Sequence, residues 1–382
     1  MAGAAPPPLQ RGLPEETAIW EILVRLPPKP LLRCRAVCRA WHCATSTRDF
    51  LLAHHARQPS LPLLYSYNYN CSGGLESLDI IPFDHRVRVG VAAADRLQSV
   101  ARIGDPSARP YISCDGFVVL FVGQEHLCIV NPATRQCARL PSLCIISTHQ
   151  PAGMYPHRPT GEYRILLAPD DPDDSYQVYT LGSSEPPRHI DIEGPCGEDL
   201  SPSTPLMFRG SLHWCTGSII HVFNTTTESF LQMLAPDVPH SVDRYVMDIL
   251  YGAVLFDMDG MLSMPILTDE FTSIGIWAMQ DYENEVWTSK YRVELPLADL
   301  TVQFGKFNPC IHGVPAFLDG DVIILVQFGD WLLQFDMDGK LVANLRNCRG
   351  LFPTRHQLKQ TLVQHTFFPT LEGYAVNASP FI

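Results

Sequence analysis

DGFVVLF, residues 115–121, places an Asp-Gly pair directly in front of a run of β-forming side chains. A two-residue hairpin turn needs positive φ at both central positions, and Asp and Gly supply it readily. Val and Phe favour strands because their side chains pack well on a pleated surface. The stretch therefore predicts a tight turn that opens a buried β-strand.

Three further stretches repeat this pattern: RGSLHWC at 209–215, DGMLSM at 259–264 and DGDVIILV at 319–326. A second run of β-forming residues follows each turn, as LCIVNPATRQ at 127–136 follows the first. Beyond residue 60 the apolar runs are short, Gly, Pro, Asn and Asp separate them, and no long segment has a helical period. This part of the chain is predicted to be all-β.

The spacing of these turns indicates a repeat. Their glycines are Gly116, Gly210, Gly260 and Gly320, and the first interval is nearly twice the second. GEYRILLAPDDPDDSYQVYTL, from Gly161, is the unit expected within that first interval, and a further unit is expected at residues 61–91. About six units of roughly 45 to 60 residues match the blades of a β-propeller. We expect six blades, with seven or eight left open.

A ring of blades has to close on itself, because an unpaired strand edge is open to pairing with other chains. The strand pattern nearest the C-terminus is FFPTLEGYAV, at 367–376. We expect this segment to pair with a strand of the first unit.

Residues 13–55 differ in texture and predict three short helices separated by proline: LPEETAIWEILVRLPPKPLLRCRAVCRAWHCATSTRDFLLAHH. Pro14 suits the first turn of a helix, and Glu15 and Glu16 place negative charge at its positive end. An apolar stripe with helical spacing follows, and Pro27-Pro28 ends this helix. The stripe consists of Ile19, Ile22, Leu23 and Leu26.

A second helix is expected from Pro30, with an apolar face and an arginine-rich face, and a third from the capping-box pattern at 46–49. The two faces are Leu31, Cys34, Val37, Cys38 and Trp41 on one side, and Arg33, Arg35 and Arg39 on the other. So few residues make a poor core on their own. The apolar stripes are therefore candidates for an interface with a partner.

The charge of the chain changes sign near residue 57. Residues 1–57 contain eight Lys/Arg and four Asp/Glu, whereas the rest of the chain contains 20 and 36. Six basic residues and no acidic one lie between Glu21 and Asp49. A nucleic-acid site is not indicated, since this segment is short, lacks interleaved aromatic residues and belongs to an acidic protein. A solvated helix face and a docking surface for an acidic partner both stay open.

Residues 13–55 resemble an F-box, the helical module with which substrate receptors dock onto the Skp-family adaptor of cullin-RING ubiquitin ligases. The resemblance rests on Leu-Pro, Glu-Ile-Leu, Arg-Leu-Pro, Leu-Leu-Arg, Val-Cys-Arg-x-Trp and Phe-Leu, which occur in that order. Pro30 stands where a small polar residue is usual, and it still suits a helix start. The resemblance implies this adaptor-binding set: Leu13, Pro14, Ile19, Ile22, Leu23, Leu26, Pro27, Leu31, Leu32, Val37, Cys38 and Trp41.

Residues 60–380 resemble the F-box-associated domain found behind the F-box in a large plant family of receptors. The matching phrases are CDG at 114–116, NPATR at 131–135, GSLHW at 210–214 and EVWT at 285–288. The chain is then mainly β with a small N-terminal α module, a three-helix F-box followed by a β-propeller of about six blades. The expected domains are a disordered tail at 1–12, an F-box at 13–57 and a propeller at 58–382.

The two resemblances imply a non-enzymatic substrate-recognition subunit of an SCF-type (Skp/cullin/F-box) ubiquitin ligase, in the nucleus, the cytoplasm or both. The F-box would dock on the adaptor and through it reach cullin, while the propeller would bind a protein substrate. No cofactor is expected. The alternative for the β region is a propeller that binds a sugar or another small molecule and has no role in ubiquitin transfer.

A second alternative lies in AVLFDMDGML, residues 253–262, which resembles the nucleophile strand of haloacid-dehalogenase-type phosphatases. On that interpretation Asp257 is the nucleophile and Asp259 the general acid. Met261 stands where that family has Thr or Val, and the surrounding sequence lacks the alternating helices of a parallel sheet. DMDG also recurs at 336–339, as expected of a hairpin turn in a repeat protein.

Metal sites and membrane segments are not indicated. The twelve cysteines are scattered without a CxxC pair, so neither zinc nor disulfides are expected. DDPDD at 170–174 lacks the spaced ligands and the closing Glu of a calcium loop. The first 12 residues carry no apolar core for a signal peptide, and the most apolar window, 321–335, is interrupted at Gly329 and Asp330. We expect a soluble intracellular protein.

Overall fold

The computed structural model of the chain describes residues 14–69, 74–84, 97–123, 126–140, 149–171, 173–195, 197–200, 204–237, 254–268, 272–305, 313–318, 320–328, 331–346 and 351–382. They form two compact units. The helical unit contains the chain up to Pro59 together with Lys359–Gln364, and the β unit contains Ser60–Leu358 and His365–Ile382. In these described ranges, no helix has the length and apolar character needed to cross a membrane.

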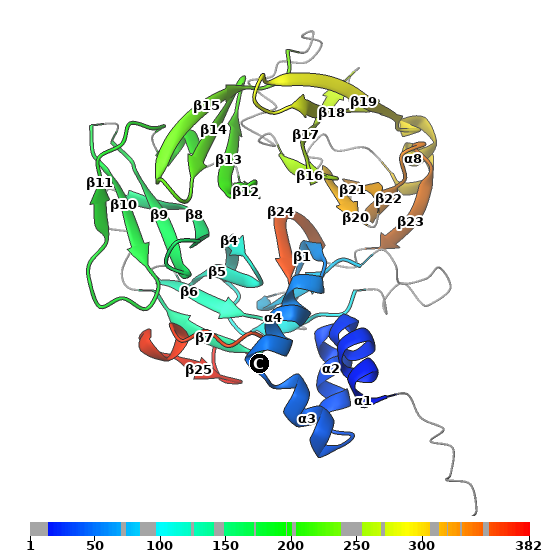
Figure 1. Cartoon of the computed structure of the whole chain (residues 1–382). Coiled ribbons are helices and arrows are strands. Elements are labelled where there is room, and N and C mark those ends of the chain that lie inside the picture. Colours follow the sequence, from blue (N-terminus) through cyan, green and yellow to red (C-terminus); the bar gives the residue numbers. More distant parts are fainter. Residues whose placement is uncertain are drawn as a thin grey trace, which may run out of the picture. The chain divides into compact units, whose positions relative to one another are not determined.

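The helical unit has the predicted helices with one additional break (Figure 1). Its elements are α1 (Glu15–Thr17), the π-helical η1 (Ala18–Ile22), the 3₁₀ turn η2 (Leu23–Arg25), α2 (Pro28–Arg35), α3 (Arg39–Thr45) and α4 (Arg48–Arg57). The second predicted helix is divided because Cys38 is extended and its sulfur accepts a hydrogen bond from Trp41 N at 3.4 Å, as the N-cap of α3. Thr47 caps α4 in the same way, with Phe50 N as donor at 3.3 Å.

The β unit is a propeller, and the prediction of six blades is confirmed (Figure 1). Blades 1 to 6 are the sheets β24-β1-β2-β3, β4-β5-β6-β7-β25, β8-β9-β10-β11, β12-β13-β14-β15, β16-β17-β18-β19 and β20-β21-β22-β23. The first strand of each sheet in this order lies towards the centre of the ring in Figure 1. Neighbouring inner strands touch, as β4 touches β8 and β16 touches β20.

The bounds of the strands and of the short helices between them follow. The strands are β1 (Ser60–Tyr69), β2 (Leu75–Pro82), β3 (Ala101–Ile103), β4 (Arg109–Cys114), β5 (Phe117–Val122), β6 (His126–Asn131), β7 (Gln136–Arg139), β8 (His149–His157), β9 (Glu162–Pro169), β10 (Tyr176–Thr180), β11 (Arg188–Ile190), β12 (Leu206–Phe208), β13 (Ser211–Thr216), β14 (Ile219–Asn224), β15 (Ser229–Leu234), β16 (Phe256–Met258), β17 (Met261–Thr268), β18 (Ser273–Asp281), β19 (Val286–Glu294), β20 (Gly313–Leu318), β21 (Asp321–Phe328), β22 (Trp331–Phe335), β23 (Leu341–Arg346), β24 (Leu351–Lys359) and β25 (Ala375–Val376). The helices are α6 (Gly197–Leu200), α8 (Leu297–Phe304) and η3 (Phe368–Thr370).

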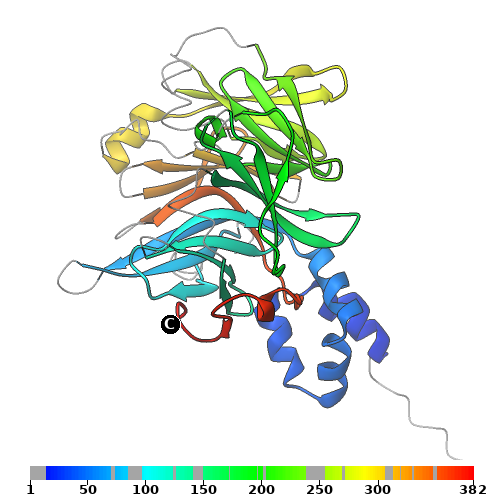
Figure 2. The ribbon, with the colours of Figure 1, turned by 90° about the vertical axis from the view of Figure 1, so that its left-hand side faces the viewer.

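The ring closes through β24, and the prediction that residues 367–376 close it is wrong. β24 pairs with β1 in blade 1, and Thr354 Oγ1 donates a hydrogen bond to Leu63 O at 2.7 Å. The C-terminal segment, red in Figure 2, instead adds β25 to the outer edge of blade 2. Ala375 pairs there with Cys137. The pattern of β24, LFPTRHQLK, is rich in polar residues, so it does not stand out as a strand in the sequence.

The glycine turns form hairpins with both central residues in the left-handed region. φ is 47° and 92° at Asp115-Gly116, 47° and 80° at Arg209-Gly210, and 54° and 77° at Asp259-Gly260. Positive φ at both positions is the mark of a type I′ turn, whose twist matches that of the flanking strands. In blades 2, 4 and 5 such a turn joins the innermost strand to the next one.

A second repeated turn joins the third and fourth strands of blades 2, 4 and 5, at residues 131–135, 224–228 and 281–285. Each begins with an Asn or Asp whose side-chain oxygen accepts two backbone N–H groups further along the turn. Each ends with a residue at positive φ, which is 51° for Glu228 and 55° for Glu285. Asn and Asp favour such turns because their side chains imitate a backbone acceptor.

In blades 4 and 5 this last turn residue also binds the preceding blade. Glu228 accepts hydrogen bonds from Tyr155 Oη at 3.0 Å and Arg164 Nη1 at 2.7 Å, both in blade 3. Glu285 accepts one from Leu234 N, at the end of blade 4, at 2.8 Å. Burial would raise the pKa of Glu228, but hydrogen bonds from arginine and tyrosine outweigh burial and lower it. The turn residue is therefore ionised and connects two blades.

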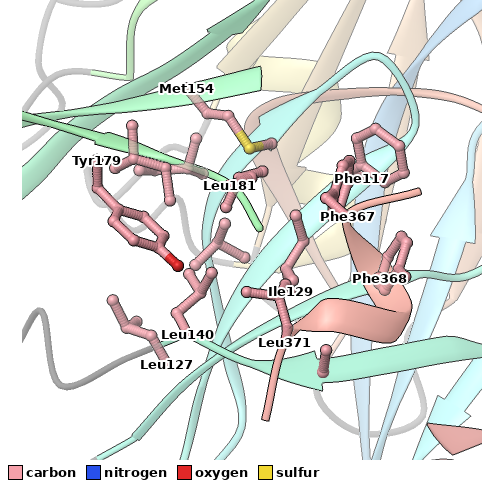
Figure 3. Packing of buried hydrophobic residues seen from close by; sticks show 14 of the residues in the cluster. Phe117, Leu127, Ile129, Leu140, Met154, Tyr179, Leu181, Phe367, Phe368 and Leu371 are labelled. Atoms are coloured by element: carbon pink, nitrogen blue, oxygen red, sulfur yellow. The ribbon is translucent and has the colours of Figure 1, made fainter. Parts of the chain in front are cut away.

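Six apolar clusters lie at the junctions between neighbouring blades, one at each junction. Figure 3 shows the cluster between blades 2 and 3, to which the C-terminal segment contributes Phe367, Phe368 and Leu371. The junction between blades 6 and 1 packs Leu325 against Leu64, so the ring closes by the same kind of contact. Because a strand supplies both of its faces to such clusters, its apolar run is continuous instead of alternating.

Two buried histidines make the β unit sensitive to acid. Desolvation by burial lowers the pKa of His213 and of His356 to about 4. Neutral His213 donates a hydrogen bond from Nδ1 to Ser211 O at 3.1 Å and accepts one at Nε2 from Tyr282 Oη at 2.7 Å. The hydrogen bond accepted at Nε2 requires the neutral ring, so protonation would disrupt it.

We expect the β unit to lose stability as the pH falls from about 6.5 to about 4. The unfolded chain binds protons at both histidines near pH 6.5, whereas the folded chain binds them near pH 4, so the contribution is complete above pH 6.5 and is lost on acidification. Each histidine contributes at most roughly 3 kcal/mol to the free energy of unfolding above pH 6.5. Urea unfolding at a series of pH values measures the effect. His356→Leu should flatten the pH dependence, and His126→Leu, exposed at the start of β6, should leave it unchanged.

Candidate functional site

The helical unit has a small core of its own. The buried apolar side chains of its helices are Ile19, Leu23, Val24, Leu31, Phe50 and Leu51. The ring of Phe50 lies 5.6 Å from the ring of Trp20 and 6.3 Å from that of His54. The chain up to Arg25, α2 and α4 thus share one interior.

Polar contacts connect the helices of this unit. His54 Nε2 donates a hydrogen bond to Leu26 O at 2.8 Å, and Gln58 Nε2 donates a second to the same oxygen at 3.1 Å, so α4 holds the end of the first helical segment. Burial lowers the pKa of His54, which keeps the ring neutral. Arg35 Nη2 donates to Thr45 O at 2.6 Å, so the end of α2 holds the end of α3.

A segment from the far end of the chain completes the unit. Lys359–Gln364 belongs to the helical unit, although it follows β24 of the propeller. Thr361, Leu362 and Val363 are buried, and Thr361 Oγ1 accepts a hydrogen bond from Val363 N at 3.2 Å. The motifs of residues 13–55 gave no sign of this segment, because nothing local to 359–364 links it to helices near the start of the chain.

The structure divides the residues of the predicted adaptor-binding set. Ile19, Leu23 and Leu31 are buried in the core of the unit, and Leu26 and Trp41 are half-buried. The exposed members are Pro14, Ile22, Pro27, Leu32, Val37 and Cys38. Leu13 lies outside the described residues. The sequence pattern placed buried and exposed residues in one set. Helical spacing shows that residues share a face of a helix, but it does not show which of them the rest of the protein buries.

Large apolar side chains are exposed on this unit, and two of them lie outside the predicted set. The exposed apolar set, with exposed fractions, is Trp20 (39%), Ile22 (44%), Leu32 (42%), Val37 (66%) and Leu52 (43%). Trp20 was missed because it follows Ile19 and lies off the predicted stripe. Leu52 was missed because no apolar face was identified in the third predicted helix. Several such side chains on one small unit mark it as a candidate for partner binding.

The basic residues of this unit also divide into two groups. Arg35 is half-buried and holds α3, so its role is structural. The others are exposed, and Arg25 forms an ion pair of 3.0 Å with Glu21. The exposed basic residues of the helices are Arg25, Lys29, Arg33, Arg39, Arg48 and Arg57. They place positive charge on the surface of this unit.

The aspartate motif of the phosphatase alternative is a hairpin turn. β16 and β17 run antiparallel, with Met258 opposite Met261. Asp259 and Gly260 lie between them at positive φ. Asp257 Oδ1 accepts a hydrogen bond from Gly260 N at 2.8 Å, so this carboxylate caps the turn. The geometry gives no support to Asp257 as a nucleophile or Asp259 as a general acid.

The other aspartate clusters are turns as well. In the repeat of DMDG, Asp336 Oδ1 accepts hydrogen bonds from the backbone N–H groups of Asp338 and Lys340. In DDPDD, Asp171 Oδ1 accepts one from Asp173 N at 3.0 Å. Across the described ranges, His, Cys, Asp and Glu nowhere gather in groups of three that could hold a metal ion.

Two protein families match the chain. The F-box associated β-propeller domain matches residues 90–330, and the F-box-like family matches residues 11–57.

Several F-box proteins of Arabidopsis thaliana are similar to the chain. F-box/LRR-repeat protein At2g43260 is 24% identical over 306 residues, which cover 74% of this chain and 67% of the relative. F-box protein At5g49610 is 25% identical over 348 residues, with coverages of 83% and 89%. F-box protein CPR1 is 24% identical over 378 residues, with coverages of 85% and 82%.

Among solved structures, a nidogen/laminin complex contains a chain that is 10% identical, with a TM-score of 0.43 and coverages of 76% of this chain and 96% of that chain. A score of this size carries no conclusion about the present chain.

The neighbouring residues Leu31 and Leu32 provide a test of which side chains form the core of the helical unit. Leu31→Ala removes a fully buried side chain and should destabilise the helices by about 2–5 kcal/mol. Leu32→Ala removes an exposed one and should cost less than about 1 kcal/mol. Amide hydrogen exchange across residues 14–57 of the full chain measures both. Equal loss of protection in the two variants would contradict the assignment of inner and outer residues.

Proposed function

Because this chain belongs to the F-box proteins that carry an F-box associated β-propeller domain, we propose that it is the substrate-recognition subunit of an SCF-type ubiquitin ligase. The helical unit docks on a Skp-family adaptor, and through the adaptor the chain reaches cullin. The propeller binds a protein substrate. The observation that supports this assignment most is the exposed apolar set on the F-box helices, since a small unit gains nothing by exposing such side chains unless a partner covers them.

Docking combines two kinds of contact. Ile22, Leu32 and Val37 belong both to the predicted adaptor-binding set and to the exposed apolar set, so these three are the primary contacts. The buried members of the predicted set support them from within the helical unit. The exposed arginines and Lys29 complement an acidic adaptor, which raises the association rate and fixes orientation more than it adds affinity.

The chain itself carries out no chemistry in this proposal. A substrate held by the propeller comes close to the ubiquitin-transferring subunits, and proximity replaces a bimolecular encounter. The described aspartate clusters form turns, which agrees with a receptor that binds without catalysis. The expected location is the nucleus, the cytoplasm or both, where cullin-based ligases work.

The docking proposal predicts that Leu32→Ala combined with Val37→Ala weakens binding to a purified Skp-family adaptor by about tenfold or more, because two side chains lose the apolar surface they bury on docking. Surface plasmon resonance with the full chain measures the affinity. Leu231→Ala is the matched control, since Leu231 is as exposed as Val37 but lies on β15 of the propeller.

Circular dichroism and hydrogen exchange establish that the double variant is folded. Unchanged adaptor affinity in a folded double variant would contradict docking through Leu32 and Val37. If the wild-type chain fails to bind any Skp-family adaptor, the ubiquitin-ligase proposal falls, and a propeller that binds ligands without a role in ubiquitin transfer takes its place.

A further inference from the structure

A pocket of about 520 Å³ lies where blade 4 meets blade 5. One wall is residues 234–237, at the end of β15 and beyond it. The other wall is residues 283–285 and two tryptophans of blade 5, Trp277 and Trp287. β15 and β19 are the outermost strands of their blades, and the end of β15 meets the start of β19, where Trp287 binds Leu234 (Figure 1). The volume is within the roughly 300–1,000 Å³ of ligand sites.

The two tryptophans give this pocket an aromatic surface. Trp287 lies opposite Met279 in the β18–β19 register, and Trp277 lies two residues before Met279, so both rings project from the same face of the sheet. Both are half-buried, whereas Trp214 of the blade 3–4 junction is fully buried. The indole N–H of Trp287 donates a hydrogen bond to Leu234 O at 2.9 Å, which fixes this ring in place.

Carboxylates surround the tryptophans. The described residues that line the pocket include Asp237, Glu283 and Glu285 and no Lys or Arg. Leu234 N fixes the Glu285 carboxylate with a hydrogen bond of 2.8 Å, while Asp237 and Glu283 are exposed. The wider field has the same sign, because the chain beyond residue 57 contains 36 acidic and 20 basic residues. A positively charged ligand is therefore attracted to the pocket at long and at short range.

Contacts between the blades explain only part of this arrangement. Glu285 and Trp287 both bind the backbone of Leu234, so they help to hold blade 5 against blade 4. Holding the two blades together requires neither the exposed carboxylates of Asp237 and Glu283 nor the partly exposed indole ring of Trp277. These three side chains are the part of the pocket that is free to meet a ligand.

We propose that this pocket binds the side chain of an arginine or lysine in a basic segment of the substrate protein. The apolar stem of such a side chain would pack on the indole rings, with its cation over a ring face and its N–H groups donating to the carboxylates. A neutral side chain of the same shape places no cation over the ring, and its N–H groups donate to the carboxylates without the help of a positive charge. That the ligand belongs to a substrate protein rests on the proposed function. That the ligand is a cationic side chain rests on the pocket alone.

The indole N–H signals of the full chain provide a direct test. The chain has six tryptophans, so its ¹H–¹⁵N spectrum contains six indole signals, which Trp→Phe variants assign. N-acetyl-arginine amide should shift the signals of Trp277 and Trp287, with a dissociation constant on the order of 1–10 mM for a single side chain. The signal of buried Trp214 should stay in place. N-acetyl-citrulline amide, which has the same shape without the charge, should bind at least about fivefold more weakly.

Charge variants identify the carboxylates involved. Asp237→Asn combined with Glu283→Gln should weaken arginine binding about fivefold or more. Asp174→Asn combined with Glu185→Gln removes the same charge from exposed positions in blade 3 and should have little effect. Equal binding of arginine and citrulline, equal losses in the two double variants, or the absence of shifts at Trp277 and Trp287 would each overturn the proposal.

The pocket test and the adaptor-binding test can fail separately. Shifts at the pocket in a chain that binds no adaptor would leave a basic-ligand site in a protein with a different role. Adaptor binding without shifts at the pocket would remove this inference and leave the proposed function intact.

Discussion

Apolar contact between neighbouring blades is the interaction on which the propeller depends. In β5, Phe117 and Val119 face the junction with blade 3, while Val118 and Leu120 face the junction with blade 1. Both faces of the strand are buried, and no blade can cover its own faces. The ring is therefore complete only when β24, from the last part of the chain, joins the blade that begins at Ser60. Pairing between segments so far apart in the sequence has a higher cost in loop-closure entropy than pairing between neighbouring strands.

The turns contribute to the same contacts. A two-residue turn that lies in the left-handed region opens blades 2, 4 and 5, and a longer turn headed by Asn or Asp connects their outer strands. In two blades the last residue of the longer turn is a glutamate that binds the preceding blade. The longer turn therefore has two roles: it forms a tight connection within its own blade, and its last residue binds the neighbouring blade.

The sequence predicted the parts of this structure that local chemistry determines. Asp115-Gly116 and its repeats predicted hairpins and six blades. The motifs of residues 13–55 and of the β region predicted both families, as the family matches confirm. Closure by β24 and the burial of residues 361–363 were not predictable, because they depend on neighbours far away along the chain. The difference between Leu31, in the core, and Leu32, on the surface, is equally a matter of tertiary packing. The pocket at Trp277 is lined by residues of two blades, so no single sequence motif predicts it.

The segment Lys359–Gln364 belongs to the helical unit although it lies near the end of the chain, so a single cut in the sequence does not separate the two units. The chain passes from the helical unit to the propeller once, returns after β24, and passes to the propeller again before β25. Three crossings join the units, where a domain on a single tether would have one. Deleting the N-terminal helices would therefore remove the rest of the unit to which Thr361, Leu362 and Val363 belong, and would expose apolar surface. A substitution on the surface of the helical unit leaves this segment covered.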